Sequence, residues 1–311
     1  MSLQRALELV ATDPGRAYPK PTVGAVLVRE GEIVGEGVTE PGGRHGEVVA
    51  LERAGERARG ATLYVTLEPC GHHGTTPPCA DALITAGVAR VVAGSLDPNP
   101  EAAGGLERLR AAGVEVEHAD SAKARRQNEA WRTWVSEGRP FVTYKAAVTL
   151  DGRVTVPGSR WVSGEASRRL VHELRAASDA VAVGMGTVRL ENPRLDAREV
   201  AAARQPRRLA FGSGPLPQGS ELELRSGSLQ DELRALAADG VQSLLLEGGP
   251  TLAGAFLRAG LVDKLLLFVA PTLAGAGLAL LDRLAGPLSL SDLTATPVGE
   301  DFLIEAYVER L

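Results

Sequence analysis

Strand-like and helix-like segments alternate in two separate sets, one on each side of Gly138-Arg139-Pro140. This tripeptide interrupts both patterns, because glycine is conformationally free and proline lacks a backbone N–H. The chain has 311 residues, about twice the usual length of one domain. We therefore expect two α/β domains, residues 1–138 and 139–311.

In the first set, apolar runs at 23–28 and 32–38 predict two strands joined by a hairpin turn at Glu30-Gly31. The later segments follow the order strand, helix, strand, which is typical of an α/β layer with parallel strand pairs. The predicted helices are 46–58, 79–86, 101–112 and 121–137, and the further strands are 61–67, 88–94 and 114–118. Trp131 and Trp134 lie three residues apart and should form one apolar ridge against the domain core.

The second set predicts another α/β unit. Its strands are expected near 141–149, 179–184, 207–211, 241–247, 263–270 and 301–308, and its helices near 165–177 and 251–259. The longest uncharged run, Leu265 to Leu281, is interrupted by Pro271 and two glycines. It is shorter than the ~20 apolar residues that cross a bilayer, so we expect a buried strand followed by a loop.

The charge and cysteine content restrict the partners and the compartment. Lys and Arg number 34 and Asp and Glu 39, giving a net charge of -5, so the chain lacks the basic surface that binds nucleic acid. Two cysteines cannot make a disulfide framework, which favours a reducing compartment. The opening residues carry no uninterrupted apolar segment of a secretory signal. We expect a cytoplasmic protein with no membrane and no nucleic-acid partner.

Three of the five histidines and both cysteines fall between residues 45 and 79. His45, Cys70 and Cys79 together suit a tetrahedral zinc ion with one open position for water. The order His45-Gly46-Glu47, Pro69-Cys70 and then Cys79 matches the pattern of zinc deaminases, in which the glutamate carries protons and does not bind the metal. Zinc lowers the pKa of a bound water to about 7, so hydroxide is available at neutral pH. Glu47 is the expected catalytic acid and base.

An alternative is a purely structural zinc site with His72 or His73 as a fourth ligand. Glu47, two residues after His45, argues against it. Both ligand segments also precede predicted helices, whose N-termini favour thiolates.

The stretch TLEPCGHHGTTPPCADALITAGVARVV, followed by DPNP at 97–100, resembles the bifunctional riboflavin-biosynthesis deaminase/reductase family. Eight residues separate the cysteines, whereas nucleoside and RNA deaminases have two. The segments TYKAAVTLDGRV, SRWVSGEA, HELRAASDAVAVGMGTVRLENPRL and LLLEGGPTLAGAFL resemble the second domain of the same family. The resemblance covers nearly the whole chain.

The resemblance implies an N-terminal cytidine-deaminase-like α/β/α domain followed by a dihydrofolate-reductase-like α/β domain. It also implies two reactions on a phosphorylated pyrimidine. The first removes the 2-amino group of 2,5-diamino-6-ribosylamino-4(3H)-pyrimidinone 5′-phosphate, and the second reduces its ribosyl group to ribityl with NADPH. The residues by themselves support only the zinc hydrolysis.

The resemblance further implies site residues. Lys145 and Glu191 join Glu47 as catalytic residues. The implied substrate-binding residues are Asp97, Asn99, Lys145, Ser159, Arg175, Leu195, Arg198 and Glu247. The implied NADPH-binding residues are Ala147, Trp161, Gly184, Gly186, Thr187, Glu191, Ser213, Gly249, Pro250, Thr251, Leu252, Ala253, Gly254 and Ala255.

Two of these segments can be assessed from their residues. Residues 184–189 (GMGTVR) follow a predicted strand but carry Arg189 where a dinucleotide fingerprint needs glycine or alanine, so they do not form one. Residues 247–251 (EGGPT) lie between a strand and a helix, where backbone N–H groups could face an anion.

Among the departures from the family pattern, three bear on the substrate contacts of the deaminase: Lys20 between Pro19 and Pro21, Thr39, and Thr75. They raise the alternative of a reductase with a degenerate deaminase half. A non-enzymatic pyrimidine-binding module with structural zinc is a further alternative, which Glu47 opposes. We also expect a homo-oligomer, a dimer or a tetramer, although the uncharged run at 265–281 fits a buried strand as well as an interface.

Overall fold

The computed structural model describes residues 2–12, 17–72, 77–202, 204–282 and 284–309. The chain divides into two compact units, Met1–Glu137 and Gly138–Leu311. Each unit is an α/β layer structure with its own sheet and its own core.

The sheet of the first unit has the strand order β2-β1-β3-β4-β5. Its strands are β1 (Gly24–Arg29), β2 (Glu32–Val38), β3 (Thr62–Val65), β4 (Arg90–Ala93) and β5 (Glu115–His118). β1 is antiparallel to both β2 and β3, and the β3-β4 and β4-β5 pairs are parallel. The predicted hairpin and the predicted parallel pairs are therefore confirmed.

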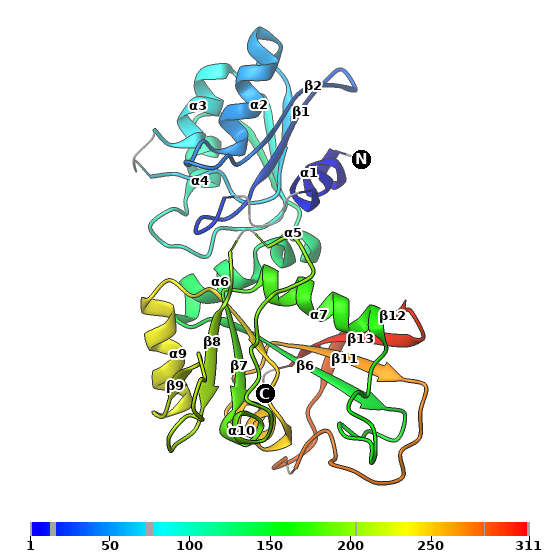
Figure 1. Ribbon diagram of the computed structural model, residues 1–311. Helices are drawn as coiled ribbons and strands as arrows, with labels where there is room; N and C mark the ends of the chain where they lie inside the picture. The colour runs from blue at the N-terminus through cyan, green and yellow to red at the C-terminus, as the bar shows by residue number, and fades with distance from the viewer. Residues whose placement is uncertain (1, 13–16, 73–76, 203, 283, 310–311) are drawn as a thin grey trace. The chain divides into compact units, whose positions relative to one another are not determined.

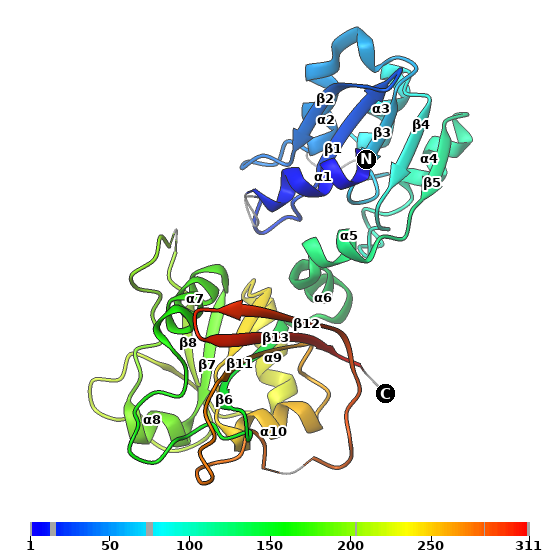
Figure 2. The same ribbon diagram turned by 90° about the vertical axis from the view of Figure 1, so that its right-hand side faces the viewer.

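Glycines let helices pack closely on both faces of this sheet (Figures 1 and 2). A Cβ on Gly24 would lie 2.1 Å from the carbonyl oxygen of Ala6 in α1, and a Cβ on Gly37 would lie 2.1 Å from that of Gly46 in α2. Gly24 and Gly37 are on opposite faces, because Gly37 pairs with Ala25. The helices are α1 (Ser2–Ala11), α2 (Gly46–Ala54), α3 (Cys79–Ala86), α4 (Gly105–Ala111), α5 (Ala122–Gln127) and α6 (Glu129–Glu137), with a 3-10 turn at Gly55–Ala58.

The single helix predicted at 121–137 is two helices, α5 and α6, separated at Asn128. The Asn128 side chain accepts a hydrogen bond from Thr22 N and donates one to Thr22 O, both at 3.0 Å. These bonds hold Asn128 out of the helical conformation and fix the segment before β1. Trp131 is buried in the core of the unit and Trp134 packs against it, so the predicted ridge is confirmed.

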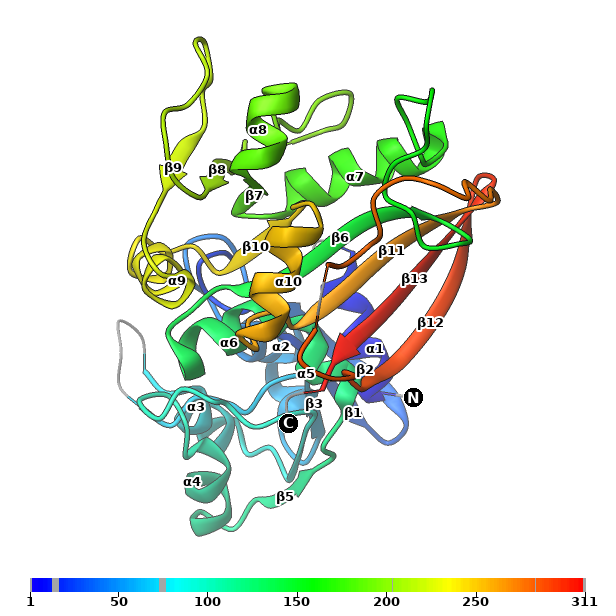
Figure 3. The same ribbon diagram turned by 90° about the horizontal axis from the view of Figure 1, so that it is seen from below.

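The second unit has an eight-stranded sheet with the order β12-β13-β11-β6-β10-β7-β8-β9 (Figure 3). Its strands are β6 (Phe141–Thr149), β7 (Ala180–Gly184), β8 (Arg207–Phe211), β9 (Glu223–Arg225), β10 (Ser243–Leu246), β11 (Lys264–Ala270), β12 (Leu290–Val298) and β13 (Asp301–Val308). The strands from β11 to β9 run parallel, and β13 and β12 form an antiparallel hairpin at the other edge. β9 and β12 are not among the predicted strands.

Helices cover both faces of this sheet, and successive side chains of β7 point alternately into the two cores that result. Ala180 and Ala182 belong to a core that includes residues of α9 and α10, whereas Val181 and Val183 belong to a second core with α8. Figure 3 shows α7 and α10 on opposite sides of β6. The helices are α7 (Glu165–Ala177), α8 (Met185–Glu191), α9 (Leu229–Ala238) and α10 (Pro250–Arg258), of which the sequence predicted α7 and α10.

The uncharged run at 265–281 forms most of β11 and then leaves the sheet as a loop, as predicted. Within the described residues, none of the helices has the length and the apolar character that a membrane span requires.

Candidate active sites

The metal-binding residues predicted in the first unit lie together. His45 precedes the first residue of α2, Cys79 is the first residue of α3, and Cys70 lies in the loop after β3. Their ligand atoms all lie within 4.8 Å of one another, and His45 Nδ1 is 3.0 Å from Cys79 Sγ and 3.7 Å from Cys70 Sγ. Tetrahedral zinc, with bonds of about 2.0 to 2.3 Å, places its ligand atoms about 3.5 Å apart. The three donors therefore fit zinc in number, kind and spacing.

Hydrogen bonds stabilise the thiolate form of Cys70. Bonds from Cys79 and His45 lower the pKa of Cys70 to about 4, and one of them is donated by the Cys79 backbone N–H at 3.2 Å. The neighbouring Cys70, together with burial, raises the pKa of Cys79. The hydrogen bond with Cys70 also raises the pKa of His45.

Glu47 lies in the first turn of α2 and is 3% exposed. Its Oε2 has no hydrogen-bond partner among the described residues. Burial raises the pKa of Glu47, because a carboxylate loses its hydration there. A buried oxygen without a partner is rare in folded proteins and is explained if a reactant supplies the partner.

A buried glutamate that the sequence analysis missed fixes the loop after β4. Glu68 Oε1 accepts hydrogen bonds from Gly104 N at 3.1 Å and Leu106 N at 3.2 Å, while Oε2 accepts one from Asp97 N at 3.2 Å. Asp97 Oδ1 in turn accepts a hydrogen bond from Asn99 N at 2.8 Å. Burial raises the pKa of Asp97 to about 6. The only sequence signal for Glu68 is its position two residues before Cys70, and this does not reveal its partners.

The structure accounts for one of the three departures from the family pattern. Thr39 is 3% exposed, and its hydroxyl accepts a hydrogen bond from Val23 N at 2.9 Å, so it serves the backbone of the sheet. The exposed Lys20 extends towards Gly43, where a Cβ would lie 3.0 Å from its Nζ. Thr75 and His73 lie outside the described residues, and His72 is exposed and outside the His45, Cys70 and Cys79 cluster.

In the second unit, three predicted residues meet beside the carboxyl end of β10. Lys145 lies on β6, Glu247 follows β10, and Arg175 lies on α7. Arg175 donates to Glu247 through Nε at 2.6 Å and through Nη2 at 3.0 Å, and Lys145 Nζ lies 3.5 Å from Glu247 Oε2. Burial opposes ionisation of Glu247, but Lys145 and Arg175 outweigh it and lower the pKa of this carboxyl. Ligands of open α/β sheets bind outside the carboxyl ends of the strands.

The other predicted substrate contacts lie on nearby loops. Leu195 is 3% exposed, and Arg198 is exposed with its Nη1 2.7 Å from Asp196 Oδ1. Ser159 donates a hydrogen bond to the carbonyl oxygen of Trp161 at 2.8 Å. The ring of Trp161 is 52% exposed, and two arginine side chains, Arg160 and Arg168, lie over it.

The two glycine segments named for NADPH begin neighbouring helices. Gly184 precedes α8 and Gly249 precedes α10, after the adjacent parallel strands β7 and β10. A Cβ on Gly186 would meet no described atom within 4 Å, and one on Gly249 would meet only Thr187 Oγ1, at 4.0 Å. The backbone is therefore open to a ligand beside the start of α10, as binding of a phosphate-bearing cofactor requires.

The remaining residues named for the cofactor differ in accessibility. Ala253 and Gly254 are buried on the core side of α10, and Thr251 Oγ1 donates to Asp282 Oδ2 at 2.7 Å. Glu191 ends α8 and is exposed, and Ser213 lies in the loop after β8. Pro250 is buried, Leu252 and Ala255 are half-buried, and Ala147 is half-buried on the same face of β6 as Lys145.

Comparisons with known proteins agree with both units. The family described as the cytidine and deoxycytidylate deaminase zinc-binding region matches residues 2–95, and the RibD C-terminal domain family matches residues 140–304. The riboflavin biosynthesis protein RibD of Aquifex aeolicus is 38% identical over 97% of this chain and 96% of its own. That of Mycobacterium tuberculosis strain H37Rv is 46% identical over 80% of this chain and 78% of its own.

Solved structures are similar over the whole chain. Form 1 of Acinetobacter baumannii RibD has a TM-score of 0.87 and 34% identity, covering 99% of this chain and 98% of that one. A deaminase/reductase of Thermotoga maritima has a TM-score of 0.83 and 33% identity with the same coverage.

Fold, site and comparisons together define a two-domain enzyme in which a zinc-dependent deaminase precedes an NADPH-dependent reductase. Its fold is the expected one, a cytidine-deaminase-like domain followed by a RibD reductase domain. The chain belongs to the RibD family of bifunctional riboflavin biosynthesis enzymes. The alternative of a reductase with a degenerate deaminase half is not favoured.

Proposed function

We propose that residues 1–138 deaminate 2,5-diamino-6-ribosylamino-4(3H)-pyrimidinone 5′-phosphate and that residues 139–311 reduce the ribosyl group of the product to ribityl. The solved Thermotoga maritima relative is described as a diaminohydroxyphosphoribosylaminopyrimidine deaminase and 5-amino-6-(5-phosphoribosylamino)uracil reductase. The observation that carries the proposal is the buried Oε2 of Glu47, which has no hydrogen-bond partner among the described residues and belongs to a carboxyl close to the His45, Cys70 and Cys79 cluster.

In the deaminase, His45, Cys70 and Cys79 hold the metal and Glu47 moves protons. Zinc, when bound, supplies Lewis-acid activation of water. Glu47 accepts a proton from the water that attacks C2 and delivers it to the ring nitrogen, and a second transfer to the amino group lets ammonia leave. The raised pKa of Glu47 suits this exchange, because a buried carboxylate accepts a proton more readily than one in water. Asp97 and Asn99 bind the pyrimidine.

In the reductase, the residues around Glu247 bind and orient the sugar. NADPH supplies the hydride that reduces C1′ of the ribosyl group. Lys145 donates the proton that the ring oxygen takes up, and Glu191 assists. Arg175, Glu247, Ser159, Leu195 and Arg198 bind the substrate. The residues that would hold NADPH are Ala147, Trp161, Gly184, Gly186, Thr187, Ser213 and Gly249 to Ala255.

The compartment and the assembly are part of the proposal. Both cysteines are free and buried, as suits a reducing cytoplasm. The β12-β13 edge exposes Leu293 and Phe302, which supports pairing of copies into a homo-oligomer. Light scattering of the purified protein at several concentrations tests the assembly.

Two variants test the two reactions separately. Glu47→Gln keeps the size of the side chain but cannot carry the proton, so ammonia release should fall by roughly 100-fold to 10,000-fold. NADPH oxidation with deaminated substrate should stay unchanged in this variant. Lys145→Met should instead lose NADPH oxidation and keep ammonia release. Near-parental ammonia release by Glu47→Gln, with zinc bound, would refute the role of Glu47.

A further inference from the structure

The turn from Leu195 to Arg198 has a backbone conformation that its own sequence does not favour. Leu195 has a φ of 54°, in the left-handed region that is uncommon for a residue other than glycine. Its side chain is 3% exposed and belongs to the core that includes Val188 of α8. Such a conformation persists only where the surrounding structure fixes it.

Gln205 fixes this turn from one side. Its Nε2 donates a hydrogen bond to Ala197 O at 2.8 Å, and its Oε1 accepts one from Ala197 N at 2.9 Å. One amide side chain therefore holds both backbone groups of Ala197, the residue directly before Arg198.

His172 and Arg175 of α7 contact the backbone of the residues on either side of Ala197. His172 is 9% exposed on α7, and its Nδ1 lies 3.2 Å from Asp196 O and 3.4 Å from Arg198 N. Arg175, one turn further along α7, donates to the same Asp196 oxygen at 3.3 Å. The turn is thus connected through Arg175 to the buried Glu247.

Two arginine side chains meet Asp196 at the turn, and Glu199 follows directly after Arg198. Arg198 Nη1 lies 2.7 Å from Asp196 Oδ1, and Arg194 Nη2 lies 3.0 Å from Asp196 Oδ2. Two guanidinium groups therefore pair with one carboxylate. Both arginine side chains remain accessible, at 46% and 76%. Arginine binds phosphate well through its planar fork of donors.

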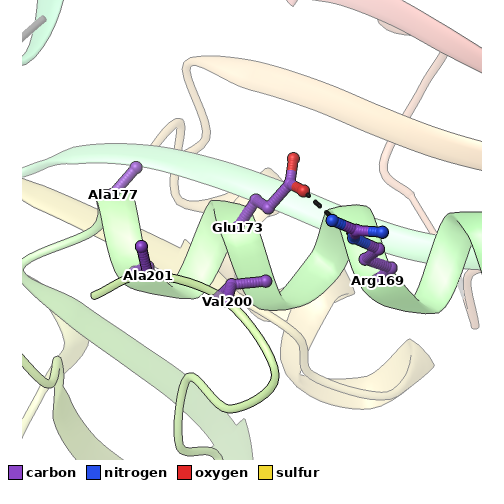
Figure 4. A pocket seen from close by; sticks show the side chains of 6 residues that line it. Arg169, Glu173, Ala177, Val200 and Ala201 are labelled. Carbon is purple, nitrogen blue, oxygen red and sulfur yellow. Dashed lines mark ion pairs between the residues drawn. The ribbon is translucent and has the colours of Figure 1, made fainter. Parts of the chain in front are cut away.

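Further along this loop, Arg204 pairs with the buried Asp179 and adds a charged anchor next to Gln205. Figure 4 shows Val200 and Ala201 beside a groove along α7, where Arg169 and Glu173 are paired with each other at 3.7 Å. Gln205, His172 and Arg175 supply the side-chain contacts to the backbone of the turn itself.

We propose that Gln205 and His172 are positioning residues of the reductase, which hold the Leu195 to Arg198 turn so that Arg198 meets the phosphate of the substrate. This inference rests on the proposed function, in which Arg198 binds the phosphorylated pyrimidine. Neither positioning residue touches the substrate, so their loss acts through Arg198.

The test is Gln205→Met in the full chain, with Gln230→Met on the exposed side of α9 as the matched control. Loss of the two bonds should raise the KM for 5-amino-6-(5-phosphoribosylamino)uracil about threefold to tenfold. The kcat and the KM for NADPH should stay unchanged, and Gln230→Met should change neither of these values nor the KM for the pyrimidine. His172→Leu should raise the same KM, and His172→Asn, which keeps a polar group near Nδ1, should restore most of it.

The double variant Gln205→Met with Arg198→Met distinguishes positioning from stability. If Gln205 acts through Arg198, the double variant should have the KM of Arg198→Met alone. An additional increase, or an equal rise in the KM for NADPH, would mean a general structural role and overturn the inference. If Arg198→Met raises KM but Gln205→Met does not, the inference alone fails. If Arg198→Met leaves KM unchanged, the proposed phosphate contact fails and the inference with it.

Discussion

Arg175 and Glu247 face each other through two parallel hydrogen bonds, from Nε to Oε1 at 2.6 Å and from Nη2 to Oε2 at 3.0 Å. This paired geometry is the strongest form of contact between a guanidinium and a carboxylate. The pair links α7 to the end of β10, and Lys145 adds a second positive charge at 3.5 Å. Two cations around one buried carboxylate leave a net positive site, which suits an anionic substrate.

Replacing Arg175 by methionine should destabilise the fold, because Glu247 then stays buried with its main partner removed. The expected loss in unfolding free energy at pH 7 is about 3 kcal/mol, measured by urea unfolding. The folded-state pKa of Glu247 is lowered, so the pair stabilises the protein above the unfolded pKa of about 4.3 and less as the pH falls below it. The difference between the two proteins should therefore shrink in acid. Arg169→Met on the exposed face of α7 is the control and should change stability by less than about 0.5 kcal/mol.

Cys79→Ser should abolish zinc binding and ammonia release while the reductase continues to turn over. Serine is a poor zinc ligand, and two remaining donors hold the ion weakly. Elemental analysis should find one zinc per parental chain and almost none in the variant. His72→Asn, at an exposed position outside the cluster, should retain zinc. A zinc-free parental preparation with full deaminase activity would contradict the site.

Asp97 should give the deaminase an acid limit near pH 6. Its pKa is raised to about 6 by burial, so the carboxylate that we propose binds the amino groups of the pyrimidine is lost below that pH. The KM should rise as the pH falls through 6, and Asp97→Asn should show a KM roughly tenfold higher at neutral pH without that rise. Because a raised pKa means that ionisation costs stability at neutral pH, the variant should not unfold more easily at pH 7. A parental acid limit in Asp97→Asn would exclude Asp97 as the titrating group.

Gly249→Val should weaken NADPH binding without disturbing the fold. A Cβ there has open space, and the φ of -67° suits any residue, so the new side chain projects into the space assigned to the cofactor. The KM for NADPH should rise roughly tenfold, which corresponds to about 1.4 kcal/mol. Steady-state kinetics with each ligand varied separately gives the result. A change in the pyrimidine KM alone would place the cofactor elsewhere.

A fragment that begins at residue 138 should fold and reduce deaminated substrate with NADPH in preference to NADH. The unit Gly138–Leu311 contains its own sheet and both of its cores. Circular dichroism and NADPH oxidation check this prediction. An unfolded or inactive fragment would mean that the reductase depends on residues before 138.

The sequence predicts those parts of the molecule that rest on local patterns. The His45, Cys70 and Cys79 cluster follows from the preferences of zinc, and the hairpin of β1 and β2 follows from alternation and a turn. By contrast, β12 is mostly exposed, contains Pro297 and has a bulge between Ser291 and Thr294, so its residues carry little strand signal. Its strand form depends on pairing with β13.

Side chains that act on distant backbone groups are also hidden in the sequence. Glu68 binds backbone groups at 97, 104 and 106, and Gln205 binds Ala197. Asn128 divides a predicted helix because of a contact with Thr22, 106 residues away. No local pattern indicates these partners, because the fold alone brings them together.

The place of β6 in its sheet has a consequence for synthesis on the ribosome. β6 is the first strand of its unit in sequence, but it lies between β10 and β11, which follow about a hundred residues later. All five strands of the first sheet are complete by residue 118, so that sheet can assemble while later residues are still being translated. The apolar strand 141–149 must instead wait without partners until residues 243–270 have emerged. During that interval its apolar side chains are open to aggregation and to chaperone binding.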